Sequence, residues 1–192
     1  SSPPFGPAFL TVPSDIATAP EAPFVGIHPP EPDADDDSRY DAIVAALSKA
    51  RRPVAVVGTA LDRRADSGAI RAFLRSFAMP VAVTPQAKGV VDERADSFVG
   101  AVATGACDTP IQLALRESDC ILGIGFDAVE SSQDWHYGAP VYNLANGPTG
   151  YGDYDPVECT GNVSALLARL ENDAGNNAVW KTSEIAGLRK AV

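Results

Sequence analysis

Short apolar runs alternate with helical patterns through most of this 192-residue chain, and the alternation constrains the fold more than any other feature. Runs such as "PVAVVG" and "CILGIG" are apolar at nearly every position, which is typical of strands buried on both faces of a parallel sheet. Between them, apolar residues recur three and four positions apart, as on one face of a helix. The pattern predicts a doubly wound α/β domain over residues 38–172, with a mostly parallel six-stranded sheet and helices on both faces.

The same periodicities place most of the individual elements. We expect strands at 53–58, 81–84, 120–125, 140–144 and near 157–159. We expect helices from Ser38 to the residues before Pro53, around Ile70 to Phe77, at 109–118 and at 162–170. Ser38 and Asp41 have the spacing of a capping box, which predicts that the first helix starts there.

The two ends of the chain differ from its middle. Nine of the 16 prolines fall within the first 32 residues, which predicts an extended, acidic linker over 19–37. Before the linker, "GPAFLTVPSDI" has the pattern of a short strand with little to pair with, as at the end of another domain over 1–18. Within 173–192, "VWKTSEIAGLRKAV" predicts a last helix without an obvious partner inside the chain.

Charge and composition exclude several classes of function. A net charge of −10 argues against an extended nucleic-acid interface, because phosphate binding depends on clustered Lys and Arg. No apolar run approaches the roughly 20 residues that a membrane span needs. The odd number of cysteines argues against a disulfide framework, and Cys120 and Cys159 lie in apolar runs typical of buried, reduced thiols. We therefore expect a soluble, cytoplasmic protein.

Catalytic and metal-binding patterns are weak in this sequence. The two histidines, His28 and His136, give little support for a metal site or a Ser-His-Asp triad. "SSQDWHYGAP" places Trp135 and His136 either on a ligand cleft, on a neighbouring domain, or in buried packing under the following strand. We assign no catalytic residue and no metal ligand.

Candidate binding residues lie where the predicted strands end, because ligands of open α/β sheets bind at the carboxyl ends of the strands. The residues at these ends are Gly58, Thr59, Thr84, Lys88, Gly89, Gly125, Phe126, Asp127 and Asn146. None of the loops has the glycine spacing of a dinucleotide fingerprint or a P-loop. The alternative interpretation is that the glycines only make tight turns and that Lys88 is an exposed cation beside one of them.

The order and spacing of five segments resemble the central domain of thiamine diphosphate-dependent enzymes of the acetolactate synthase and 2-oxo acid decarboxylase type. The segments are "GPAFLTVPSDI", "ARRPVAVVGTAL", "MPVAVTPQAKGVVDERADSFVG", "LRESDCILGIGFD" and "ECTGNVSALLARL". The resemblance covers nearly the whole chain and implies a Rossmann-like central domain over 38–172. It implies that 1–18 end a pyrimidine-binding domain, that 19–37 link the two, and that 173–192 run toward a diphosphate-binding domain.

The resemblance also implies what the parent enzyme does. Such enzymes decarboxylate 2-oxo acids or transfer the resulting acyl group, usually as homodimers or homotetramers. Thiamine diphosphate and Mg²⁺ lie between the pyrimidine- and diphosphate-binding domains, so this fragment would be a non-catalytic scaffold. "GDYDP" at Gly152-Asp153 and the pair Asn176-Asn177 look like the family's metal-binding signature, but they lack the preceding strand that it requires.

Some members of the family bind FAD or ADP across the strand ends of the central domain. Thr84, Lys88 and Gly89 match the pattern found there. The sequence departs from that pattern at Gly125-Phe126-Asp127-Ala128, where relatives carry Arg-Phe-Asp-Asp, and at 143–146, where they carry Asp-Ile-Asp-Pro. The lost carboxylates would accept sugar hydroxyls, so we expect a vestigial cleft that is empty or weakly occupied.

Two other interpretations stay open from the sequence. The first is an independent module that senses FAD, ADP or a CoA compound, although such a module would not need the segments that precede and follow the α/β domain. The second is an enzyme of the related NAD-consuming deacylase kind, which shares a similar parallel sheet. That class requires a catalytic His and a Gly-Ala-Gly loop after the first strand, and "GTALDRR" supplies neither.

Overall fold

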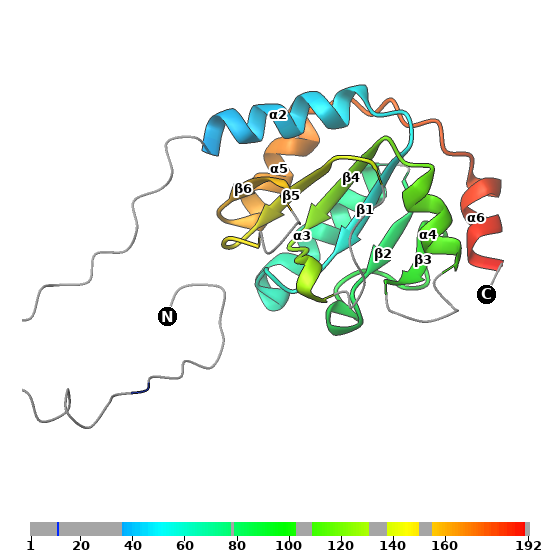
Figure 1. Ribbon diagram of the computed structural model, residues 1–192, viewed down its shortest axis with the longest axis horizontal. Helices are drawn as coiled ribbons and strands as arrows, with labels where there is room; N and C mark the ends of the chain where they lie inside the picture. The colour runs from blue at the N-terminus through cyan, green and yellow to red at the C-terminus, as the bar shows by residue number, and fades with distance from the viewer. Residues whose placement is uncertain are drawn as a thin grey trace, which may run out of the picture.

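The computed structural model describes residue 11 and residues 36–77, 79–102, 109–130, 138–149 and 155–190. Six parallel strands form one sheet in the order β3-β2-β1-β4-β5-β6 (Figure 1). The strands are β1 Pro53–Val57, β2 Val81–Val83, β3 Phe98–Ala101, β4 Cys120–Ile124, β5 Val141–Ala145 and β6 Val157–Thr160. The helices are α2 Asp36–Lys49, α3 Arg63–Ser76, α4 Thr109–Arg116, α5 Val163–Asp173 and α6 Thr182–Lys190, with short 3₁₀ turns η1 Pro85–Ala87 and η3 Ala128–Glu130.

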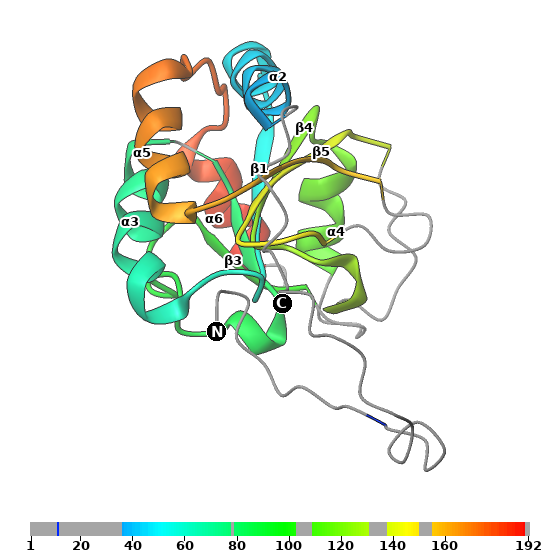
Figure 2. The same cartoon turned by 90° about the vertical axis from the view of Figure 1, so that its left-hand side faces the viewer.

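The predicted doubly wound architecture is confirmed. Helices α3 and α5 pack together on one side of the sheet and α4 lies on the other (Figure 2). Helix α2 lies above the sheet in Figure 1 and contacts β6 and β4. Every residue of β1 and β4, the two central strands, is buried, as their continuous apolar runs predict. Within the described residues, no helix is both long and apolar enough to cross a bilayer.

The strand order reverses between β1 and β4, since the chain builds outward to β2 and β3 and then returns to the other side of β1. The carboxyl ends of β1 and β4 therefore flank a topological switch point of the sheet. Such a switch point is where open α/β sheets bind their ligands. The topology therefore directs attention to the loops after these two strands.

The first helix differs from its predicted bounds. Helix α2 begins at Asp36, so Ser38 lies inside the first turn and the predicted capping box is wrong. The carboxylate of Asp37 lies in the first turn of the helix, at its positive end, where carboxylates are favoured. The helix ends at Lys49 rather than just before Pro53, and Pro53 begins β1.

The sheet has an edge strand that the pattern did not place. Strand β3 pairs with β2 and is only partly buried, so its residues do not form the continuous apolar run that marked the central strands. Helix α6 lies against β3 and α4. This cover protects an edge that would otherwise present unpaired backbone groups.

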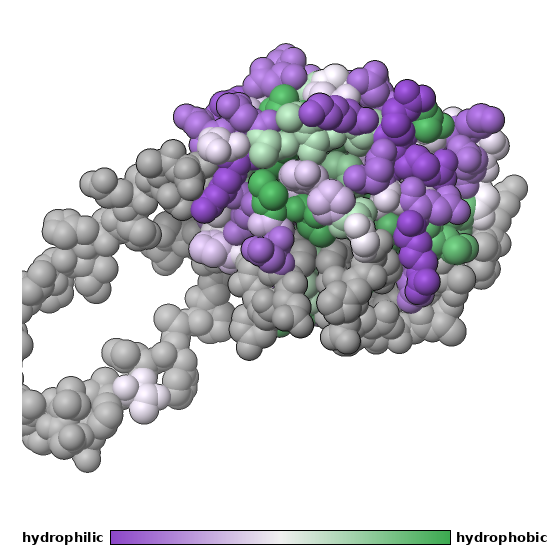
Figure 3. All heavy atoms as spheres, turned by 45° about the horizontal axis from the view of Figure 1, so that its top comes forward, coloured by the Kyte–Doolittle hydropathy of each residue, from purple (hydrophilic) through white to green (hydrophobic). Residues whose placement is uncertain are grey.

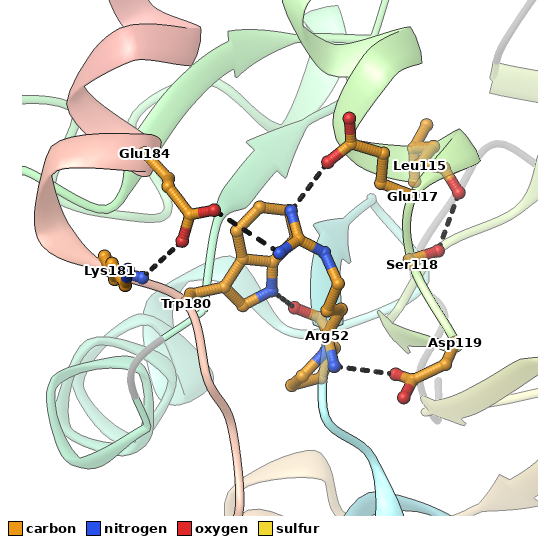
Figure 4. Close-up of polar contacts among 9 residues, drawn as sticks. Arg52, Leu115, Glu117, Ser118, Asp119, Trp180, Lys181 and Glu184 are labelled. Carbon is orange, nitrogen blue, oxygen red and sulfur yellow. Dashed lines mark hydrogen bonds and ion pairs between the residues drawn. The ribbon is translucent and has the colours of Figure 1, made fainter.

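The last helix has partners inside the chain, so the prediction that it lacks them is wrong. Trp180, just before α6, and Ile185 within it are 7% and 6% exposed and belong to the core. The indole N–H of Trp180 donates to the carbonyl oxygen of Pro53 at 2.8 Å, and the Arg52 guanidinium lies 3.7 Å from the centre of the Trp180 ring (Figure 4). The segment after α5 thus packs back against the start of β1.

Four other contacts complete this arrangement, which we call the amino-end clamp. The clamp consists of the residues Arg52, Glu117, Asp119, Trp180 and Glu184. Arg52 binds Glu117 at 2.6 Å and Glu184 at 3.5 Å. Asp119 accepts from the backbone N–H groups of Arg51 and Arg52 at 2.7 and 2.9 Å. The clamp joins the starts of β1 and β4 to the segment leading into α6 (Figure 4).

The surface over α2 is mostly hydrophilic around a smaller hydrophobic area (Figure 3). Among the described residues, the exposed large hydrophobic side chains are Leu113, Val129, Val157 and Val179. They come from α4, η3, β6 and the segment before α6. Scattered exposed apolar residues of this kind need no special explanation.

Candidate functional site

A cleft of about 810 Å³ opens at the switch point. The residues that define this switch-point cleft here are Thr59, Asp62, Arg63, Arg64, Asp127 and Glu130. They come from the loop between β1 and α3, the first turn of α3, and the segment after β4. Two predicted site residues, Thr59 and Asp127, therefore lie on its wall.

Gly58 lets the two loops approach each other closely. A Cβ atom on Gly58 would lie 2.4 Å from the carbonyl oxygen of Gly125 and 2.6 Å from a carboxylate oxygen of Glu130. The backbone N–H of Ala60 donates to the same Gly125 carbonyl at 2.8 Å. Gly58 and Gly125 thus allow the two loops to meet, and a side chain on Gly58 would force the loops apart.

Glu130 extends from η3 across the switch point to the ends of β1 and β2. Its Oε1 accepts from the backbone N–H of Thr59 at 2.9 Å, and its Oε2 accepts from the Thr84 hydroxyl at 2.7 Å. Thr84 is fully buried. The half-buried carboxylate of Glu130 therefore satisfies two donors at the ends of β1 and β2.

A second carboxylate caps α3 at the same cleft. Asp62 Oδ1 accepts from the backbone N–H groups of Arg64 and Ala65 at 2.9 and 3.1 Å, as an N-cap residue does. The backbone N–H of Asp62 in turn donates to buried Asp66, whose other oxygen accepts from the Ser164 hydroxyl at 2.6 Å. These bonds fix the start of α3 against α5.

The Lys88-Gly89 turn lies outside the cleft lining. Gly89 has φ +86°, and its carbonyl oxygen accepts from Arg71 at 2.6 Å, while the Lys88 carbonyl accepts from Arg63 at 2.6 Å. The Lys88 side chain is 60% exposed and its Nζ lies 4.0 Å from Glu93. Guanidinium groups of α3 hold the backbone of this turn, while the Lys88 amine faces solvent.

The loop after β4 is held by a residue that the sequence did not indicate. Asn143, on β5, is fully buried, and its side-chain amide bonds both the N–H and the carbonyl of Phe126, at 3.3 and 2.9 Å. A Cβ on neighbouring Gly123 would lie 2.4 Å from Asn143 Oδ1. An amide inside the apolar run "PVYNL" was the available signal, since a buried polar side chain needs partners.

The remaining predicted site residues support the loops. Phe126 is fully buried, and Asn146 donates its backbone N–H to the Ala60 carbonyl at 2.9 Å. Asp127 accepts from the N–H of Val129 at 3.0 Å, which shapes the turn that carries Glu130. Gly125, Phe126, Asp127 and Asn146 thus place the cleft walls.

Other predicted features are structural or lie outside the described residues. Burial raises the pKa of the Cys120 thiol to about 12, so this cysteine is no nucleophile at neutral pH. Asn176 and Asn177 donate their side-chain N–H groups to the carbonyl oxygens of Ser76 and Ser48, at 3.1 and 2.7 Å. His28, Trp135, His136, Gly152 and Asp153 lie outside the residues that the structure describes.

The comparison with known families decides the assignment. The family model described as "Thiamine pyrophosphate enzyme, central domain" matches residues 40–162. The chain belongs to this family. The predicted resemblance is therefore confirmed, and the sheet is that of a thiamine pyrophosphate enzyme central domain.

Individual relatives of this central domain include two curated enzymes and a solved structure. Acetolactate synthase of Bacillus subtilis is 30% identical over 191 residues, covering 88% of this chain and 31% of the synthase. Pyruvate decarboxylase of Kluyveromyces lactis is 25% identical over 117 residues, covering 60% of this chain and 20% of the decarboxylase. Benzoylformate decarboxylase from Polynucleobacter necessarius shares the fold, with a TM-score of 0.60 and 16% identity over 82% of this chain and 30% of that chain.

Proposed function

We propose that this chain is the central scaffold domain of a thiamine diphosphate-dependent enzyme that decarboxylates 2-oxo acids or transfers their acyl group, as acetolactate synthase-like enzymes do. The observation that carries the proposal is the match to the family's central domain over 40–162. The chain spans less than a third of the length of the relatives it matches. The parent's activity and the chemistry of its other domains are inferred from those relatives.

The proposed division of the chain gives each segment a role. Residues 1–18 would end the pyrimidine-binding domain, 19–37 would link it to the central domain over 38–172, and 173–192 would lead toward the diphosphate-binding domain. The amino-end clamp supports a fixed path for the last segment, because Trp180 is held against the start of β1. The homodimeric or homotetrameric state of the parent and its cytoplasmic location remain predictions.

The described residues do not fit thiamine diphosphate and its Mg²⁺. They contain no group of three or more His, Cys, Asp or Glu side chains that could hold a metal ion. The amide N–H groups of Asn176 and Asn177 are bonded to backbone carbonyls beside α3 and α2. We therefore assign cofactor binding to the other domains of the parent and derive no chemical step for this one.

We further propose that the switch-point cleft is a vestigial FAD- or ADP-type cleft. Its position at the strand-order reversal is where such ligands bind in open α/β sheets. Its wall carries three carboxylates against two guanidiniums, and this net negative charge opposes the phosphate groups of a nucleotide. The carboxylates are those of Asp62, Asp127 and Glu130, and the guanidiniums are those of Arg63 and Arg64. The alternative of an independent sensing module is not favoured, because the family match accounts for the same fold without it.

An activity assay tests the scaffold proposal. The 192-residue chain, supplied with thiamine diphosphate, Mg²⁺ and pyruvate or benzoylformate, is expected to release no CO₂ above the buffer rate. The matched control is a chimera in which this chain replaces the central domain of acetolactate synthase of Bacillus subtilis. In the chimera the chain is joined to pyrimidine- and diphosphate-binding domains. Decarboxylation by the chain alone, abolished by removing Mg²⁺, would contradict the proposal.

A further inference from the structure

Two hydrogen-bond donors lie at the carboxyl ends of β1 and β2, where Glu130 of the switch-point cleft reaches them. One is the backbone N–H of Thr59, just after β1, and the other is the hydroxyl of Thr84, just after β2. Open α/β sheets bind ligands outside the carboxyl ends of their strands, and N–H donors at adjoining helix starts can hold an anionic group. In this chain both donors already bind an anion, because each donates to one oxygen of Glu130.

The position of Glu130 is built by the surrounding backbone. Its own N–H donates to the Asp127 carbonyl at 3.0 Å, which closes the turn that points the side chain back across the switch point. Gly58 leaves the space that the carboxylate fills, since a Cβ there would lie 2.6 Å from Glu130 Oε1. The bonds join η3 to residues 71 and 46 positions earlier in the chain, so the contact is tertiary and not a local turn.

We propose that Glu130 is an internal ligand: its carboxylate occupies the anion position at the switch point and excludes phosphate-bearing molecules from the cleft. The proposal rests on the vestigial cleft proposed above and names the residue that occupies its anion position. Two effects act together. The carboxylate uses the two donors, and its negative charge opposes a second anion beside it.

The other donors and cations of the cleft do not offset Glu130. The carboxylate of Asp62 already accepts from the first-turn N–H groups of α3. The guanidinium of Arg63 donates to the Lys88 carbonyl, on the backbone of the neighbouring turn. Without Glu130, the two carboxylates of Asp62 and Asp127 would face the two guanidiniums of Arg63 and Arg64, and two donors would be released.

The test measures binding of ADP and of inorganic phosphate to the 192-residue chain by titration calorimetry. Wild type is expected to show no binding at millimolar ligand. Glu130→Ala frees both donors and is expected to bind ADP at least about tenfold more tightly, since a hydrogen bond to a charged group is worth roughly one such factor. Glu130→Gln keeps the volume but loses the charge, so its affinity should lie between the two.

A control separates this effect from a general change in charge. Glu171 is exposed on α5, where it accepts from the Ser76 hydroxyl. Glu171→Ala removes the same charge and is expected to leave ADP binding as in wild type. If Glu171→Ala gained as much affinity as Glu130→Ala, the effect would be long-range electrostatics and the proposal would be overturned.

A second measurement keeps the test decisive if Glu130→Ala is poorly folded. Sodium acetate supplies a carboxylate that fits the vacated position, so it should raise the melting temperature of Glu130→Ala more than that of wild type. Sodium chloride at the same ionic strength should not. Equal effects of the two salts on Glu130→Ala would overturn the proposal.

The outcomes also distinguish this proposal from the one on which it rests. ADP binding by wild type as tight as by Glu130→Ala would overturn both the vestigial cleft and the role of Glu130. No binding by wild type and none by Glu130→Ala or Glu130→Gln would leave the vestigial cleft standing and overturn the role of Glu130. Tighter binding by the variants alone supports both.

Discussion

At the amino ends of β1 and β4, charged side chains fill the space between elements, whereas at the carboxyl ends of the same strands they surround a cleft of about 810 Å³. In the amino-end clamp, Arg52 lies between the Trp180 ring and two carboxylates (Figure 4). In the switch-point cleft, Glu130 binds two strand-end donors and leaves open volume beside it. One end of the sheet is packed and the other is kept open.

The two ends of the sheet differ in how their side chains are used. Side chains at the amino end join segments far apart in the sequence, and Trp180 and Pro53 are 127 positions apart. At the carboxyl end, the loops are held by contacts of Asn143, Gly58 and Glu130. These contacts fix the shape of the loops without filling the cleft. Substitutions at both ends should therefore lower stability, with a larger loss at the packed amino end than at the cleft.

The largest effect is expected at the amino end. Trp180→Ala removes a buried ring, its hydrogen bond to Pro53 and the contact with Arg52, and should lower the free energy of unfolding by about 3–5 kcal/mol. Urea unfolding followed by circular dichroism measures the change. Val179→Ala, at the exposed neighbouring position, is the matched control and should change little. Equal stability of Trp180→Ala and wild type would show that the last segment is not part of the core.

A smaller effect is expected for the Thr84–Glu130 pair at the carboxyl end. Thr84→Val and Glu130→Ala each leave a partner without its hydrogen bond, so each should cost about 1–3 kcal/mol of unfolding free energy. The double variant should cost less than the sum, because the second change removes a group already unpaired. Additive costs in this cycle would mean that the two side chains do not act together.

Part of the loss of stability in acid should come from Glu184 of the amino-end clamp. The N–H of Lys181 donates to Glu184, and this bond together with the Arg52 charge lowers the pKa of the Glu184 carboxyl. A lowered pKa stabilises the fold above the unfolded value of 4.5, and the contribution is lost as pH falls through the folded pKa. Glu184→Gln should therefore lose stability less steeply in acid than wild type. Melting temperatures across this range, with Glu171→Gln as control, check the slope; parallel slopes for Glu184→Gln and wild type would contradict it.

The smallest effect is expected at the Lys88-Gly89 turn. Lys88→Ala removes an exposed amine and should change the free energy of unfolding by no more than about 0.5 kcal/mol. Arg71→Ala, which removes the donors to the Gly89 and Val90 carbonyls, should cost more. A larger loss for Lys88→Ala than for Arg71→Ala would show that the amine has a structural role.

The sequence predicted the sheet because its central strands are buried on both faces and therefore read as continuous apolar runs. It missed β3, whose residues are only partly buried and include Gly100. The strand ends were located correctly, yet Glu130 was missed, because "DAVESSQ" carries no periodic signal and its contacts form only when η3 folds back. The partner of Trp180 was missed for the same reason, since no local pattern indicates a contact with Arg52.

The most direct test of the central claim is thermal unfolding of the 192-residue chain with thiamine diphosphate and Mg²⁺, compared with FAD, ADP, CoA and NAD added singly. A ligand at 100 times its dissociation constant stabilises a fold by about 2.7 kcal/mol, so binding would be visible as a higher melting temperature. A scaffold domain in which Glu130 occupies the strand-end donors of the cleft predicts no shift with any of them. A shift with thiamine diphosphate that depends on Mg²⁺ would contradict the assignment of cofactor binding to the other domains.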